Sequence, residues 1–123
     1  MTIIEAINKV DELKPNSYTQ PDKIRWLSNL DGTIKKEIID THEDGEMVIF
    51  DGYNSDTSTG TELLVKAPYD ELYLYWLESR MDYYNAEYGR YNNTLAMFNA
   101  AYSAYESFYN RAHMHKGQKF KFF

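Results

Sequence analysis

Aromatic side chains at helical spacing between Pro68 and Ala112 constrain the fold of this chain more than any other feature. Ten of the twelve tyrosines lie in this segment. Eight of these tyrosines belong to two successive series with steps mostly of three and four residues: Tyr69, Tyr73, Trp76, Leu77, Met81, Tyr84 and Tyr88, then Tyr91, Leu95, Phe98, Tyr102, Tyr105 and Tyr109. A stripe with this rhythm lies along one side of a helix. The pattern therefore predicts that this part of the chain is helical and has an aromatic face.

Two arrangements of this segment fit the stripe. Gly89 can end one helix and Asn92 or Asn93 can cap the next, which gives a hairpin of two helices of about 20 residues each. The alternative is one continuous helix of about 44 residues, because the stripe passes Gly89 without losing phase. We expect the hairpin, since helices of matched length bury more surface in a small domain.

The first forty residues predict two shorter helices. Thr2 and Glu5 have the spacing of a capping box, and apolar residues follow at helical intervals until Pro15. A second helix is expected to start near Pro21 and to fade near Thr41. The expected fold class is mainly α: a small helical bundle that forms a single domain over residues 1–123.

Residues 43–66 differ in character from the flanking helices. Two short apolar runs, 47–50 and 63–65, enclose a stretch rich in Gly, Asn, Asp, Ser and Thr at 51–60. This pattern predicts a long central β-hairpin or loop arm, steadied by packing on the helices or on another subunit. Phe50 and Tyr53 in this arm are candidate partner-binding residues.

The last ten residues, 114–123, alternate basic and aromatic types and predict an extended C-terminal tail. Phenylalanines at the end of a chain are poorly placed in water, so we expect them to dock on a protein surface. The candidate partner-binding residues of the tail are Lys116, Lys119, Phe120, Lys121, Phe122 and Phe123.

The charge of the chain limits the classes of partner that it can bind. The net charge is −6, and every acidic residue lies at or before Glu106. An acidic body argues against non-specific nucleic-acid binding, which depends on neutralising phosphates, whereas the basic tail can meet an acidic surface of another chain. No apolar run is long enough to span a membrane, and Glu5 stands where a signal peptide carries basic residues. We expect synthesis and assembly in the cytoplasm.

No pattern in the sequence predicts catalysis, a cofactor or a metal. Residues 40–51 partly resemble an EF-hand loop, but His42 occupies a position that requires an oxygen ligand, and no helix is expected to follow. His113 and His115 offer two imidazoles, fewer than a metal site usually needs. The chain contains no cysteine, nucleophile elbow or phosphate-binding loop. We therefore predict a non-enzymatic protein.

The tyrosines exceed what the core of a small helical bundle needs. Tyr and Trp are enriched where protein subunits meet, because their rings are apolar while their polar groups still find partners. We expect one aromatic face to point inward and another to contact neighbouring chains.

Several stretches resemble the head–tail connector adaptors, or neck proteins, of tailed bacteriophages and prophages. The resemblance covers residues 3–112 and rests on these stretches: Trp26-Leu27-Ser28-Asn29-Leu30-Asp31-Gly32, Pro68-Tyr69-Asp70-Glu71-Leu72, Tyr91-Asn92-Asn93, Met97-Phe98-Asn99 and Tyr109-Asn110-Arg111. It is a likeness of general texture without a catalytic signature. The turn-rich segment 43–66 departs from the family's pattern.

The resemblance implies a homo-oligomeric ring of about twelve copies in the neck of the virion. One edge of the ring would bind the portal protein and the other the next neck or tail protein. Residues 114–123 would dock on the portal, and residues 43–66 would line the channel or bridge neighbours. DNA would pass through the channel only as cargo.

Two other functions remain open from the sequence. One is a small phage-encoded binding or regulatory protein that works as a monomer or dimer. The other is a metal-dependent enzyme that uses His42, His113 and nearby carboxylates. Co-assembly with a portal separates the first alternative from the connector, and metal titration tests the second.

Overall fold

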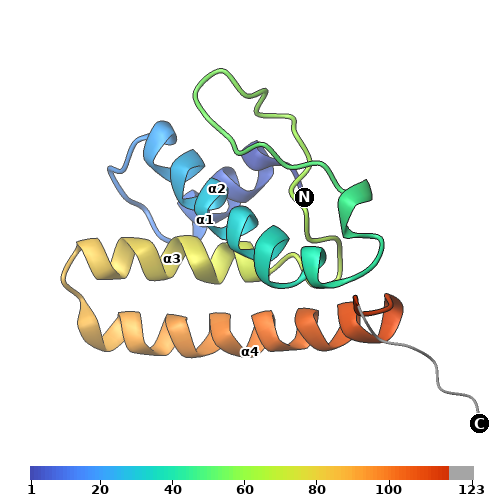
Figure 1. Ribbon diagram of the computed structural model, residues 1–123. Coiled ribbons are helices and arrows are strands. Elements are labelled where there is room, and N and C mark those ends of the chain that lie inside the picture. The colour runs from blue at the N-terminus through green and yellow to red at the C-terminus, as the bar shows by residue number, and fades with distance from the viewer. Residues whose placement is uncertain (117–123) are drawn as a thin grey trace, which may run out of the picture.

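The computed structural model describes residues 1–116 and shows a mainly helical protein (Figure 1). Its elements are α1 (Ile3–Leu13), α2 (Gln20–Glu37), the short 3-10 helices η1 (Ile39–Thr41) and η2 (Gly45–Met47), α3 (Leu72–Tyr84) and α4 (Tyr88–Ala112). Helix α4 runs along one edge of the molecule with α3 antiparallel beside it, and α1 and α2 lie on the other side of α3. Helix α3 therefore contacts three helices, whereas α4 packs mainly against α3.

The first two helices begin where the sequence predicts. The Thr2 hydroxyl accepts a hydrogen bond from the Glu5 backbone N–H at 3.2 Å, and the Glu5 carboxylate accepts one from the Thr2 N–H at 3.0 Å. The capping box is thus confirmed, and it satisfies N–H groups that a helix start leaves without partners. At the start of α2 the Thr19 hydroxyl accepts from the Asp22 N–H at 3.2 Å.

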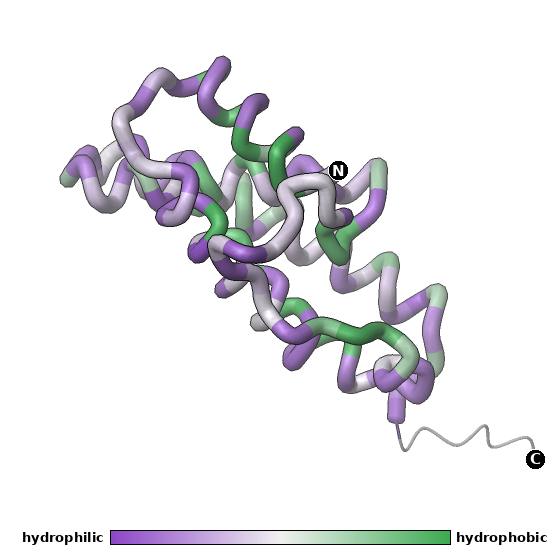
Figure 2. The backbone as a smooth tube through the Cα atoms, turned by 90° about the horizontal axis from the view of Figure 1, so that it is seen from above, coloured by the Kyte–Doolittle hydropathy of each residue, from purple (hydrophilic) through white to green (hydrophobic). Residues whose placement is uncertain are grey.

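The core lies between α3 and the pair α1–α2. Each helix is buried along one side, and Figure 2 shows hydrophilic and hydrophobic residues interspersed along the helices, as such one-sided burial requires. The buried hydrophobic residues of the helices include Ile3, Ile7 and Val10 of α1, Ile24, Leu27, Leu30 and Ile34 of α2, Leu72, Tyr73, Leu77 and Met81 of α3, and Phe98, Tyr105 and Tyr109 of α4. Helix α4 supplies only three buried residues from its 25.

The expected helical hairpin is confirmed, but its turn lies earlier than predicted. Helix α3 ends with the Asn85 N–H donating to Met81 O at 2.8 Å and the Glu87 N–H donating to Asp82 O at 2.9 Å. Between them Ala86 has a φ of 60°, the left-handed conformation that commonly closes a helix. Gly89 lies inside α4, and beyond its chain neighbours and the backbone of its own helix turn, no atom lies within 4 Å of where a Cβ would stand. The expectation of a turn at Gly89 and of two equal helices was therefore wrong, because alanine takes the position where glycine is usual.

The prediction of a β-hairpin at 43–66 was also wrong. Within residues 1–116 there is no strand, only the isolated bridges Thr2–Glu62 and His42–His115. The buried run 63–65 gives its backbone N–H groups to other parts of the molecule. Leu63 donates to Met1 O at 3.0 Å, Leu64 to the Asp31 carboxylate at 3.1 Å, and Val65 to the Tyr73 hydroxyl at 2.8 Å.

The first apolar run of the predicted hairpin, residues 47–50, also forms no strand. Met47 and Ile49 are 83% and 81% exposed, whereas Val48 and Phe50 on either side of Ile49 are half-buried. Residues 43–66 therefore form a long connection that wraps over the helices, as Figure 1 shows.

The predicted tail begins on the surface of its own chain. The Glu43 N–H donates to Met114 O and the Lys116 N–H donates to Thr41 O, both at 2.8 Å. Residues 114–116 thus lie antiparallel to residues 41–43. The rest of the predicted tail, including Lys119, Phe120, Lys121, Phe122 and Phe123, lies outside the described residues.

Candidate protein-binding surface

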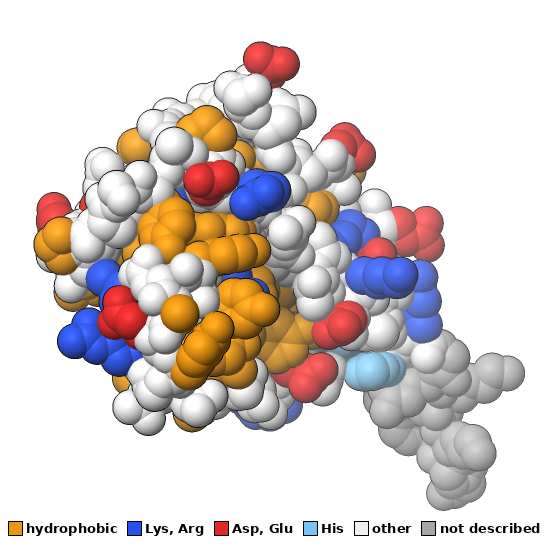
Figure 3. Space-filling model, turned by 90° about the vertical axis from the view of Figure 1, so that its left-hand side faces the viewer, with side chains coloured by type: hydrophobic (Ala, Val, Ile, Leu, Met, Phe, Trp, Pro, Cys, Tyr) orange, Lys and Arg blue, Asp and Glu red, His pale blue; other side chains and the backbone are white. Residues whose placement is uncertain are grey.

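Exposed aromatic rings gather at the turn between α3 and α4. Tyr83, Tyr84 and Tyr88 are 46%, 56% and 60% exposed, and Leu13, at the end of α1, is 63% exposed. Figure 3 shows the hydrophobic side chains that face the viewer at this end of the molecule, with charged groups around them. We refer to Tyr83, Tyr84 and Tyr88 as the aromatic end, in which the ring centre of Tyr83 lies 5.4 Å from that of Tyr84 and 6.4 Å from that of Tyr88. Contiguous apolar surface ringed by charge is typical of protein–protein contacts.

The rings of the aromatic end are held by the residues beneath them. Tyr84 stacks on the buried Trp26 with ring centres 5.7 Å apart. The Arg80 guanidinium lies 4.3 Å from the centre of the Trp76 ring and 5.7 Å from that of Tyr83. Such cation–π contacts hold a planar cation against aromatic faces. The aromatic end is therefore a prearranged surface, which lowers the entropy lost when a partner binds.

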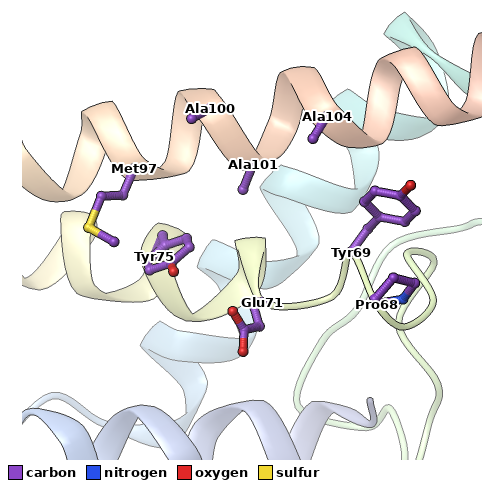
Figure 4. Close-up of a pocket in the computed structure, with 8 residues that line it drawn as sticks. All are labelled: Pro68, Tyr69, Glu71, Tyr75, Met97, Ala100, Ala101 and Ala104. Atoms are coloured by element: carbon purple, nitrogen blue, oxygen red, sulfur yellow. The ribbon is translucent and has the colours of Figure 1, made fainter.

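A second apolar surface lies between α3 and α4, nearer the start of α3 (Figure 4). We call it the α3–α4 groove. Its volume is about 370 Å³, and it is lined by Pro68, Tyr69, Glu71, Tyr75, Met97, Ala100, Ala101 and Ala104. The α4 residues have the spacing of a single helix face, and three of the four are alanines, whose short side chains leave the groove open.

Aromatic packing shapes one end of the groove. Tyr69 stacks on Phe108 with ring centres 4.8 Å apart and lies 6.1 Å from Tyr105. In Figure 4, Met97 projects from α4 toward Tyr75 of α3 at the other end. Glu71 contributes a carboxylate to an otherwise uncharged lining.

The outer face of α4 has no charge along most of its length. Residues 91–105 contain no Asp, Glu, Lys or Arg, although charged residues make up 26% of the chain. The exposed positions of this stretch carry small or amide side chains and one Met: Asn92, Asn93, Ala96, Met97, Asn99, Ala100, Ser103 and Ala104. Depletion of charge marks the centre of protein interfaces. This uncharged run is visible in the sequence, but the predictions from the sequence rested on the tyrosines and did not include it.

Tyr53, a predicted partner-binding residue, is used inside the molecule. Its hydroxyl donates to Asp31 Oδ2 at 2.5 Å, and the Tyr73 hydroxyl donates to Asp31 Oδ1 at 2.6 Å. Asp31 is completely buried in α2. Burial raises the pKa of its carboxyl, and the hydrogen bonds from Tyr53, Tyr73 and the Leu64 N–H act in the opposite direction. This buried cluster fastens segment 53–65 to α2 and α3, which is a structural role.

Phe50 lies beside this buried cluster. Its ring meets that of Tyr53 edge-on with centres 5.0 Å apart, and its Cε1 lies 3.6 Å from where a Cβ on Gly32 would stand. Phe50 is half-buried. The structure therefore gives both predicted residues of segment 43–66 contacts within their own chain.

The fold brings the three histidines of the chain together. The His42 ring centre lies 4.3 Å from that of His115 and 6.1 Å from that of His113. The Nε2 atoms of His42 and His115 both lie within 3.0 Å of the Asn110 Oδ1, and His113 Nδ1 lies 2.5 Å from an Asp44 oxygen. The sequence did not predict that His42 lies near His113 and His115, because His42 is far from them along the chain. Among residues 1–116, no group of three or more His, Asp or Glu side chains is placed to hold a metal ion.

The stretch that resembles an EF-hand loop is tied down by contacts with its own chain. Asp40 pairs with Lys35, and Asp44 meets His113. A Cβ on Gly45 would lie 2.3 Å from the Ile39 carbonyl oxygen, so the close approach of η2 to η1 requires glycine.

A polar pocket of about 240 Å³ between α1, α3 and α4 is lined by two carboxyl side chains of α3, Glu78 and Asp82. The Lys14 ammonium lies 2.6 Å from Asp82, whose second oxygen accepts from the Thr94 hydroxyl at 3.0 Å. Burial and the neighbouring Asp82 raise the pKa of Glu78. Asp82 is buried. The ion pair joins the end of α1 to α3.

Comparison with known proteins adds no relative. The chain matches no family model, no curated protein and no solved structure.

No helix within residues 1–116 combines the length and the apolar character that crossing a membrane requires.

Proposed function

We propose that this protein is a non-enzymatic structural subunit of a head–tail connector, an adaptor that forms a homo-oligomeric ring between the portal and the tail of a bacteriophage particle. The observation that carries the proposal is the uncovered apolar surface of the α3–α4 hairpin. The aromatic end lies at its turn, and the α3–α4 groove lies between its helices nearer the start of α3. A single copy leaves both surfaces in water, which is costly unless another chain covers them.

The two surfaces differ in chemistry and position, as a ring subunit requires. A closed ring is built from heterologous contacts, in which one patch of a subunit meets a different patch of the next. Axial partners, here the portal protein and the next neck or tail protein, need further surface. The aromatic end, the groove and the uncharged face of α4 together supply such surface on one hairpin.

The charge of the chain suits a channel through which DNA passes as cargo. The described residues contain all 19 acidic residues of the protein. A wall of this charge repels phosphates, so DNA slides past without binding. The resemblance to connector adaptors contributes the specific assembly: a neck built in the host cytoplasm and retained in the virion.

Co-expression with the portal protein encoded in the same genome tests this proposal. We expect the two proteins to co-elute as a complex and to show a ring on the portal by electron microscopy. The test variant is Tyr83→Ser with Tyr88→Ser, two exposed tyrosines of the aromatic end. The matched control is Met47→Ser with Ile49→Ser, which removes two apolar side chains outside the hairpin that are even more exposed than the tyrosines.

The outcomes separate the candidate functions. Loss of the complex in the tyrosine variant but not in the control supports the connector. Absence of any complex between the unaltered proteins overturns it, and a monomeric or dimeric chain that binds a different protein points to the small binding or regulatory protein instead.

A further inference from the structure

We propose that the α3–α4 groove binds the C-terminal segment Lys119–Phe123 of a second copy of this chain. The inference rests on the proposed function and deepens it, because it names the contact between neighbouring subunits. It joins a surface that the structure describes to a segment known here from its sequence, Lys119-Phe120-Lys121-Phe122-Phe123.

The groove has the size and lining that phenylalanine rings need. A cavity of about 150 Å³ suffices for one benzene ring, so a volume of about 370 Å³ accommodates about two. The alanines of α4 form a floor without obstruction, while Tyr69, Tyr75 and Met97 offer aromatic and thioether contacts. Phe120, Phe122 and Phe123 are three phenylalanines within four residues, so the segment offers several rings to such a groove.

The charges of the segment and of the groove are complementary. Glu71 lines the groove and is exposed. Lys119 and Lys121 alternate with the phenylalanines, so a chain that places rings in the groove carries its ammonium groups along the rim. Opposite charges at a rim mainly increase the association rate and fix the register.

The position of Lys116 favours a groove on a neighbouring copy. Lys116 lies beside Thr41, just beyond the end of α2, and is held there by the backbone bonds of residues 114–116. The groove is lined by residues 68–75 and 97–104 instead. From Ala112 back to Ala100 is about 18 Å along α4, most of the roughly 25 Å that seven extended residues span. A groove on a second copy imposes no such limit on the reach of the segment.

A pair of full-length variants distinguishes exchange between copies from docking within one copy. The first variant, Ala100→Arg, fills the groove and adds a like charge against the lysines of the segment. The second replaces Phe120, Phe122 and Phe123 by Ser. Ala96→Arg is the matched control, because Ala96 is exposed on α4 but does not line the groove.

Sedimentation velocity over a concentration series is the measurement. We expect the unaltered chain and Ala96→Arg to self-associate, and each of the other variants alone to associate at least about tenfold more weakly. Mixing the two defective variants is expected to restore a complex, because one supplies an intact segment and the other an intact groove. The mixed complex is expected to be limited in size, since it holds only one working contact between each pair.

The inference is overturned if the mixture gives no complex, or if Ala100→Arg associates as the unaltered chain does. Its failure is distinguishable from failure of the proposed function. If the unaltered chain binds the portal but does not self-associate through the groove, the inference alone is overturned. Self-association through the groove without any portal binding removes the connector and leaves the inference standing.

Discussion

The two sides of the α3–α4 hairpin differ in which groups they bury and which they expose. On the side of α3 that faces α1 and α2, polar groups are buried and satisfied: the carboxylate of Asp31 accepts from two tyrosine hydroxyls and one backbone N–H. On the outer side of α4, apolar and uncharged groups face solvent with nothing of the described chain above them. The first arrangement specifies one fold, because each buried polar group must keep its partners. The second leaves surface for other chains.

The comparison predicts that damage to the buried side is severe. Asp31→Ala is expected to lower the free energy of unfolding by about 3–5 kcal/mol, because it leaves three donors without an acceptor, at about 1–3 kcal/mol each. Urea unfolding followed by tyrosine and tryptophan fluorescence measures the change. A loss below about 1 kcal/mol would mean that water replaces the carboxylate, and the buried side would then not be the stronger constraint.

Trp76→Ala is expected to cost slightly less, about 3 kcal/mol. Trp76 is half-buried, donates from Nε1 to Trp26 O at 2.9 Å, and packs with its ring centre 5.0 Å from that of Phe98. It therefore joins α3 to both α2 and α4. Thermal unfolding gives the change, and Trp76→Phe, which keeps a ring but loses the donor, serves as control. An unchanged melting temperature would assign Trp76 to the binding surface instead.

The pH dependence of the free energy of unfolding measures the contribution of the Asp31 carboxyl separately. Because burial raises the pKa of this carboxyl above 3.8, the folded protein keeps the proton at pH values where the unfolded chain has lost it. The resulting stabilisation is full below pH 3.8 and is lost as the pH rises through the folded-state pKa. We expect the stability of the unaltered chain, relative to Asp31→Asn, to fall as pH rises from about 3 to about 7. A difference that grows with pH would contradict this sign.

Substitutions on the outer side of α4 are expected to change stability least. Ala96→Arg and Ala100→Arg should each alter the free energy of unfolding by no more than about 0.5 kcal/mol, since both positions are exposed and arginine is a good helix former. The same urea unfolding experiment measures both. A large loss in either variant would show that this face is packed in the isolated chain, and the contrast between the two sides would fail.

Local signals predicted the helices well and the connections poorly. The capping box of Thr2 and Glu5 acts within one turn, so the sequence alone located the start of α1. The turn at Ala86 escaped because alanine rarely adopts a positive φ, and only the packing of α3 against α4 settles where the chain reverses. The run 63–65 was taken for a strand because buried strands and buried extended loops share the same apolar pattern.

The sequence predicted that aromatic residues would form a binding surface, but it did not predict which residues form the candidate surface. An excess of tyrosines indicated that some rings would be exposed, and Tyr83, Tyr84 and Tyr88 are. Tyr53 was predicted to contact partners, whereas in the structure its hydroxyl donates a hydrogen bond to Asp31. Asp31 lies at helical spacing from the apolar residues Leu27 and Ile34 of α2, a spacing that indicates a buried carboxylate. The groove combines residues 68–75 with residues 97–104, a pairing that the sequence cannot supply.

The starts of α1 and α2, the amphipathic stripes and the surplus of aromatic residues were determined by the sequence itself, because each depends on residues within one or two turns of one another. The burial of Asp31, the meeting of the three histidines and the groove between α3 and α4 were decided only by the tertiary structure. Each of these depends on which faces of distant segments pack together, and that choice is made by the free energy of the whole core.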